Sequence, residues 1–154
     1  MRIVSVTPDS PRRLPFFVYG TLRPGEVNHD LFLRGRTLAE DPARLPGAAL
    51  YDGPGYPYAV ERQGAAVSGE LVTARPGAYA ELLGSLDQLE EYRPGDPARS
   101  LYLRVEREVV RDTDGAAVRA WVYLAAPPVA ARLRARGRLI ESGDWRARHG
   151  KPAR

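Results

Sequence analysis

The chain has 154 residues, of which 44% are hydrophobic, and this length and composition fit one domain with a sizeable core. It contains no cysteine and two isolated histidines, which excludes a disulfide framework and a thiol nucleophile and argues against a metal centre. No apolar run approaches the roughly 20 residues that span a bilayer. We therefore expect a cytoplasmic protein that has no membrane association and needs no cofactor.

The net charge of +4 is unevenly distributed. Residues 1–131 hold 15 basic and 17 acidic side chains, whereas residues 132–154 hold 8 basic and 2 acidic ones. No aromatic residues alternate with these arginines as they do in single-stranded nucleic-acid binders. A solvated basic segment is thus favoured over a nucleic-acid surface.

The first strong signal is a strand followed by a turn. Residues 1–15 are polar and proline-rich and predict a leader or an added edge strand. Residues 16–19, Phe-Phe-Val-Tyr, then predict a buried strand that ends at Gly20. The N–H groups of Gly20, Thr21 and Leu22, freed from strand pairing, can bind a carboxylate or an oxyanion. The plainer alternative is a simple exit from a strand into a turn.

Several further strands are predicted around a single substantial helix. A short helix over 29–34, with Asn28 as its cap, precedes a bent strand over 37–50 and a central strand over 65–73. Later in the chain, strands 104–111 and 118–124 form a hairpin, and one helical turn follows residues 127–128. Glu70 is expected to be a charge on a strand face. This order of elements predicts an α+β fold built on a barrel-like sheet.

The helix over 76–92 carries a carboxylate on its apolar face. At 100° per residue Glu90 falls among the leucines, Asp87 lies near the edge of the face, and Glu91 lies outside it. Glu90 either reaches solvent or pairs with Arg104, or it lines a pocket in which burial raises its pKa into the range of a general base.

Several motifs together resemble the gamma-glutamylcyclotransferase-like family, close to the gamma-glutamylamine cyclotransferases and their small bacterial relatives. They are Val-Tyr-Gly-Thr-Leu-Arg at 18–23, Gly-Tyr-Pro at 55–57, Val-Ser-Gly-Glu-Leu at 67–71, Leu-Asp-Gln-Leu-Glu at 86–90, Tyr-Leu-Arg at 102–104 and Ser-Gly-Asp-Trp at 142–145. The resemblance implies a small mixed β-barrel flanked by a few helices. It also implies one domain over 16–148, followed by a basic tail over 149–154.

The resemblance further implies an enzyme and its site. Tyr19, Gly20, Thr21 and Leu22 would bind the glutamyl part of a small-molecule γ-glutamyl amide, and Glu90 would be the acid/base. The α-amino group of the substrate would attack its own γ-carbonyl, which releases 5-oxoproline and a free amine.

Other tyrosines keep two interpretations each. Tyr102 either borders the pocket and orients Glu90 or packs in the core at the start of a strand. Tyr56 and Tyr58 either shape the amine side of the pocket or pack within their loop.

Two other functions stay open. The protein could bind γ-glutamyl ligands without catalysis, or it could remove a γ-glutamyl protecting group from a biosynthetic intermediate, with the basic segment docking an acidic carrier. The sequence leaves monomer and homodimer undecided.

Overall fold

The computed structural model describes residues 13–147. Its strands are β1 (Phe16–Val18), β2 (Thr37–Tyr51), β3 (Tyr58–Ala74), β4 (Tyr102–Arg111), β5 (Ala117–Ala125) and β6 (Leu139–Ile140). The helices are α1 (Tyr79–Leu89) and α2 (Pro127–Arg136), with single-turn segments η1 (His29–Leu33), η2 (Pro76–Ala78), η3 (Pro97–Arg99) and η4 (Trp145–Ala147). The predicted basic tail, and all but three residues of the predicted leader, lie outside the described residues.

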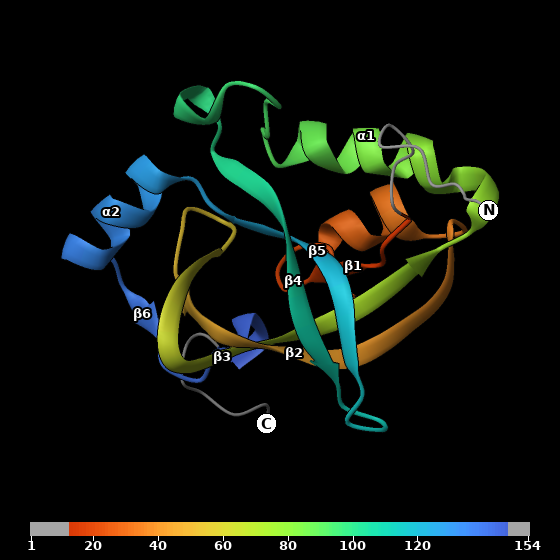
Figure 1. The fold of residues 1–154 in the computed structure, drawn as a ribbon, viewed down its shortest axis with the longest axis horizontal. Helices are drawn as coiled ribbons and strands as arrows, with labels where there is room; N and C mark the ends of the chain where they lie inside the picture. The colour runs from red at the N-terminus through yellow and green to blue at the C-terminus, as the bar shows by residue number, and fades with distance from the viewer. Residues whose placement is uncertain (1–12, 148–154) are drawn as a thin grey trace, which may run out of the picture.

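Five strands close into a barrel. The order around it is β3-β1-β5-β4-β2, and β2 pairs again with β3, while β6 adds to β2 as a short outer strand. All of these pairs are antiparallel except β1–β5, in which Phe16 lies opposite Trp121 in a parallel arrangement. Figure 1 shows α1 running over the strands on one side, with α2 and β6 together at one edge. The predicted fold, a small mixed β-barrel flanked by a few helices, is confirmed.

A long β2–β3 hairpin forms much of the barrel wall. The predicted bend in β2 is present as a register shift between Pro46 and Ala48, where Gly47, with a φ of 81°, and residues 62–65 of β3 are left out of the pairing. β3 begins at Tyr58, seven residues before the prediction, because Ala59 and Val60 already pair with β2. The exposed residues 61–64 hide this continuity from a pattern search, since they break the alternation of apolar and polar positions.

Helix α1 buries Tyr79, Leu82 and Leu86 against the barrel, as its apolar face predicts. It ends one turn before the predicted residue 92: the N–H of Glu90 still donates to the carbonyl of Leu86, and Glu91 then adopts a left-handed conformation with φ of 53°. This conformation at the residue after the cap ends helices and is usually taken by glycine.

The C-terminal region is more ordered than the sequence predicts. In place of one turn, α2 runs for ten residues and buries Val129, Ala130 and Leu133; the arginines on its outer face make this amphipathic helix resemble a polar tail. Trp145 is buried in one of the two core clusters, so deletion of residues 132–154 would damage the fold. Such a deletion could not by itself test whether the basic segment docks an acidic carrier. No helix within residues 13–147 is long and apolar enough to cross a membrane.

Candidate active site

The loop after β1 forms one wall of a small cavity. Gly20, Thr21 and Leu22 line it, and their N–H groups donate to no residue in the described part of the chain. The loop is held from outside: the N–H of Arg23 donates to the carbonyl of Gly20 at 3.0 Å, and that of Asn28 to the carbonyl of Thr21 at 2.9 Å. Three residues that line the cavity therefore have backbone donors with no partner in the described part of the chain, in a turn that other hydrogen bonds hold in place; such donors suit a carboxylate or an oxyanion.

The sequence predicts that Asn28 caps the following helix, but its side chain forms no capping hydrogen bond. Its side-chain nitrogen instead donates to the hydroxyl of Thr21 at 2.7 Å, because the loop folds back over it. Gly20 is required by close contact: a Cβ there would lie 2.7 Å from the ring of Pro57 on the opposite wall.

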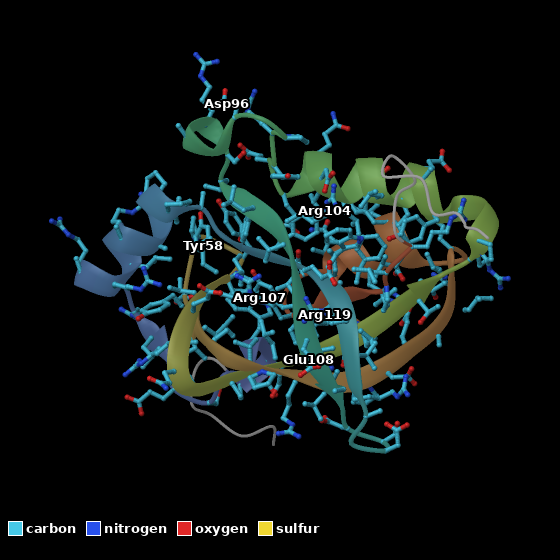
Figure 2. All side chains as sticks on the ribbon, viewed as in Figure 1. Tyr58, Asp96, Arg104, Arg107, Glu108 and Arg119 are labelled. Carbon is cyan, nitrogen blue, oxygen red and sulfur yellow. The ribbon has the colours of Figure 1, made fainter. Side chains whose placement is uncertain are left out.

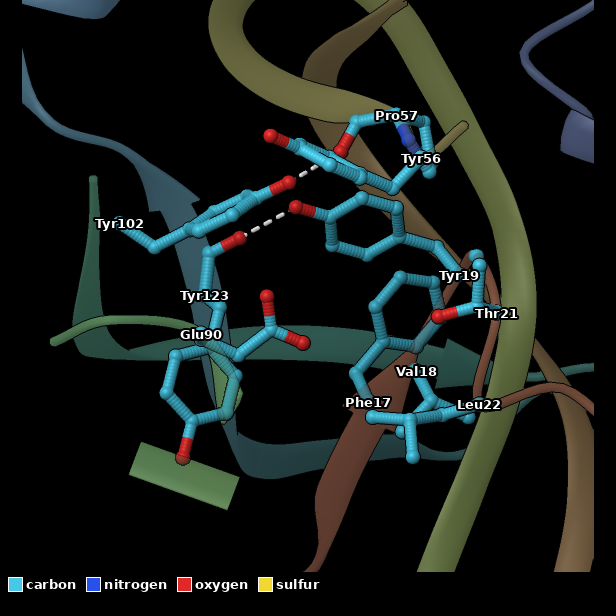
Figure 3. Close-up of a pocket in the computed structure, with 11 residues that line it drawn as sticks. Phe17, Val18, Tyr19, Thr21, Leu22, Tyr56, Pro57, Glu90, Tyr102 and Tyr123 are labelled. Carbon is cyan, nitrogen blue, oxygen red and sulfur yellow. Dashed lines mark hydrogen bonds between the residues drawn. The ribbon is translucent and has the colours of Figure 1, made fainter. Parts of the chain in front are cut away.

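Glu90 enters the same cavity from the end of α1. Figure 3 shows its carboxylate pointing into the open centre, among Phe17, Val18 and Tyr123. Within residues 13–147 this carboxylate forms no hydrogen bond or ion pair. Burial raises its pKa from 4.5 to about 7, because the charged form loses hydration with no partner to replace it. A carboxyl group of this kind can accept and return a proton near neutral pH.

The alternative pairing of Glu90 with Arg104 is wrong. Arg104 Nε donates to Asp87 Oδ1 at 2.9 Å, and the hydroxyl of Tyr123 donates to the same oxygen at 2.6 Å. Arg104 thus lies between the β4–β5 hairpin and α1 (Figure 2). Asp87 neutralises it, which leaves Glu90 without a counter-ion.

Tyrosines form the opposite wall. The Tyr19 hydroxyl donates to the carbonyl of Tyr123 and accepts from the N–H of Ala59, so its ring shapes the cavity while its oxygen is already occupied. Tyr102 both borders the cavity and packs in the core: it is 3% exposed, and its hydroxyl donates to the carbonyl of Pro57 at 2.6 Å. Figure 3 shows the hydrogen bonds from Tyr19 to Tyr123 and from Tyr102 to Pro57.

Tyr56 and Tyr58 lie at different positions relative to the cavity. Tyr56 lines the cavity, whereas Tyr58 lies behind it and stacks on Tyr102 with ring centroids 5.0 Å apart. The structure thus brings Glu90, Tyr19, Gly20, Thr21, Leu22 and Tyr102 to one cavity; their binding and catalytic roles stay predictions.

A second, wider cavity opens beside the first. The inner cavity has a volume of about 40 Å³ and the outer one about 230 Å³. Thr21, Tyr56, Glu90 and Tyr102 line both. Glu91, the neighbour of the predicted acid/base, lines only the outer one, so of the two adjacent glutamates only Glu90 reaches the inner cavity.

Sequence reasoning missed a buried ion cluster behind the loop. Arg23 Nε donates to Glu70 Oε1 at 2.8 Å and its Nη1 to Asp144 Oδ1 at 2.7 Å. Glu70 is therefore no solvated strand-face charge: it is 7% exposed, and Arg23 is 6% exposed. Alternation could have revealed this, because Glu70 shares a face with the buried Val72.

Residues 13–147 hold no group of three or more His, Cys, Asp or Glu side chains placed to bind a metal ion. The lining of the inner cavity supplies one carboxyl, that of Glu90, together with the hydroxyls of Thr21 and the tyrosines and the backbone of the loop after β1.

The sequence matches the profile of the family described as gamma-glutamyl cyclotransferase, AIG2-like, over residues 16–147. It is 37% identical over 110 residues to the gamma-L-glutamyl-butirosin B gamma-glutamyl cyclotransferase of Niallia circulans. The matched region covers 70% of this chain and 64% of the relative, so this chain spans less than two thirds of that protein's length. It is 33% identical over 129 residues to a Vibrio cholerae protein provisionally named gamma-glutamylcyclotransferase, covering 84% of this chain and 92% of that one. Among solved structures, an AIG2-like protein from Mus musculus aligns with a TM-score of 0.59 and 25% identity, over 75% of this chain and 81% of the other.

Proposed function

Because the chain belongs to the gamma-glutamyl cyclotransferase, AIG2-like family, we propose that it converts a small γ-glutamyl amide into 5-oxoproline and a free amine. The family resemblance read from the sequence motifs is thereby confirmed. One observation carries the proposal: a partly buried carboxyl with no partner in the described residues, that of Glu90, shares a cavity with three residues whose backbone N–H groups have none either.

The substrate brings its own nucleophile, so the protein has to fold it and move protons. The N–H groups of Gly20, Thr21 and Leu22 would hold either the α-carboxylate or the oxyanion that forms on the γ-carbonyl oxygen. The aromatic wall of Tyr19 and Tyr102 would press the glutamyl chain into the bent shape that ring closure needs.

Glu90 would act first as a base. As a carboxylate it takes a proton from the α-amino group while the nitrogen bonds to the γ-carbon, which gives a five-membered tetrahedral intermediate. Glu90, now protonated, then gives that proton to the amide nitrogen as the carbon–nitrogen bond breaks. The products are 5-oxoproline and the amine, no water is consumed, and Glu90 returns to its starting state.

The test is release of 5-oxoproline from a panel of γ-glutamyl amides by the wild-type protein, Glu90→Gln and Glu81→Gln. The last is a matched control, since Glu81 is an exposed carboxylate at the other end of the same helix. We expect Glu90→Gln to lose about 10²- to 10⁴-fold in rate and Glu81→Gln to match wild type. Ligand binding by the folded wild-type protein without release of 5-oxoproline from any amide would favour the non-catalytic binding role instead.

A second candidate function follows from one relative, which is named for gamma-L-glutamyl-butirosin B. Here the same reaction would remove a γ-glutamyl group that protects a larger biosynthetic intermediate, and the arginines that α2 exposes could dock an acidic carrier. Replacing Arg132, Arg134 and Arg136 by Gln should then slow turnover of a carrier-bound γ-glutamyl amide and leave the free amide unaffected. Equal rates on both forms would count against docking.

A further inference from the structure

We propose that the outer cavity binds the amine half of the substrate, and that Glu91 makes it select amines with a hydrocarbon body and a positive charge over amines that carry a carboxylate. This inference rests on the proposed cyclotransferase activity and adds its substrate class.

The two cavities divide the substrate between them. The inner cavity, at about 40 Å³ against about 230 Å³, is the smaller of the two, and it is lined by the loop of residues 20–22 that would hold the glutamyl part. Glu90 lines both cavities. A carboxyl that protonates the departing nitrogen must lie where the two halves of the substrate meet, and the amine half therefore extends into the outer cavity.

The walls of the outer cavity are largely apolar. Leu89 and Leu101 line it from α1 and the segment before β4, and Val27 lines it from the loop after β1. Val27 is 68% exposed, one of three large apolar side chains left so open in the described part of the chain. Exposed apolar surface at a cavity mouth is typical of a site that contacts a ligand, here the hydrocarbon part of the amine.

The charge at this cavity is negative. Glu91 lines it beside Glu90, no lysine or arginine does, and the Glu91 carboxylate forms no ion pair within residues 13–147. Burial is the main cause of the raised pKa of Tyr58, and Glu91 adds to that rise while Arg132 opposes it. Both charges thus lie near Tyr58, but only Glu91 lies on the cavity wall.

The backbone at Glu91 supports a role for its side chain. Its φ of 53° lies in the left-handed region, where glycine would end the helix with less strain. Glutamate at such a position destabilises the folded state, which makes sense if the carboxylate serves binding.

The experiment uses three γ-glutamyl amides with the same four-carbon spacer. Their amine halves are 1,4-diaminobutane, n-pentylamine and 5-aminopentanoate, which end in a positive, a neutral and a negative group. γ-Glutamyl methylamide, whose amine half is too short to reach the outer cavity, serves as the reference. For the wild-type protein we expect kcat/KM to fall from the positive to the neutral to the negative amide, with about a tenfold ratio between the first and last.

Three variants assign the effect. Glu91→Gln should reduce that ratio to about threefold or less, and Val27→Lys, which adds a charge opposite in sign to that of Glu91 at an exposed site of the same cavity, should reduce it likewise. Glu81→Gln removes the same charge far from the cavity and should leave the ratio at the wild-type value. Because Glu81 lines neither cavity, Glu81→Gln should turn over γ-glutamyl methylamide at the wild-type rate. For Glu91→Gln and Val27→Lys, each rate on a longer amide is divided by the rate of the same variant on the methylamide, so that a general loss of activity does not count as lost selectivity.

The outcomes separate the two proposals. Turnover of the methylamide together with equal rates on the three longer amides, or with a preference for the carboxylate, would overturn the selectivity and leave the cyclotransferase activity standing. No turnover of any amide, the methylamide included, would overturn both. A charge preference that persists in Glu91→Gln would remove Glu91 from the explanation.

Discussion

Replacing Glu90 by Gln should stabilise the protein at neutral and alkaline pH while it slows turnover by about 10²- to 10⁴-fold. The reason is the raised pKa of Glu90, about 7 in the folded protein against an ordinary value of 4.5. The folded state therefore holds this proton more tightly than the unfolded state does. The contribution of Glu90 to the free energy of unfolding is most favourable below pH 4.5, and this contribution is lost progressively as the pH rises through 7.

The shift sets the size of the effect. The difference of about 2.5 pKa units corresponds to about 3 kcal/mol of unfolding free energy once the pH is well above 7. Between pH 5 and pH 8 the wild-type protein should lose about 2.5 kcal/mol relative to Glu90→Gln. Glutamine cannot titrate and keeps nearly the same shape, so the variant should not show this loss.

Urea denaturation of both proteins at half-unit steps from pH 5 to pH 8 measures the difference directly. The contributions of other titrating groups cancel when the unfolding free energy of the variant is subtracted from that of the wild type at each pH. The unfolding free energy of Glu81→Gln should vary with pH as that of the wild type does. The same pKa should appear as the rising limb of the kcat/KM profile, since the base form of Glu90 is the reactive one. A stability difference that does not change with pH would refute a buried, unpaired Glu90.

Three other changes follow from contacts in the structure. Arg23→Met should destabilise the fold by about 3–5 kcal/mol in urea denaturation, because it leaves Glu70 buried without its cation; a loss below 1 kcal/mol would contradict the buried cluster. Gly20→Ala places a Cβ against Pro57 and should cost about 1–3 kcal/mol by overpacking, with turnover reduced more than stability; unchanged turnover would show that the loop can shift freely. Glu91→Gly should raise the melting temperature by about 2–4 °C, since glycine relieves about 1 kcal/mol of left-handed strain, and an unchanged or lower melting temperature would argue against that strain.

The sequence was most informative where regular periodicity applies. The 3.6-residue period of α1 places Glu90 on the inward face, and the turn at 112–115 locates the β4–β5 hairpin. Both signals are local, because they depend on residues within one element and on the steric preferences of the turn.

Contacts between distant segments could not be predicted in this way. Glu90 lacks a partner only because Asp87 already pairs with Arg104, and that choice depends on how the hairpin approaches the helix. Arg23 and Asp144 are 121 residues apart, and no local pattern links them. The division into two cavities, with Glu90 at their boundary, likewise arises from packing between α1 and the loop after β1.

The Arg23 cluster also has a consequence for the order in which the chain matures on the ribosome. Translation at about 5–20 residues per second leaves roughly 6–24 seconds between synthesis of Arg23 and of Asp144. Glu70 follows Arg23 by 47 residues and Asp144 follows it by 121, so for most of that interval Glu70 is present and Asp144 is not. The nascent chain can form the β2–β3 hairpin and α1 early, but it cannot complete the support of the glycine loop until residue 144 has left the exit tunnel.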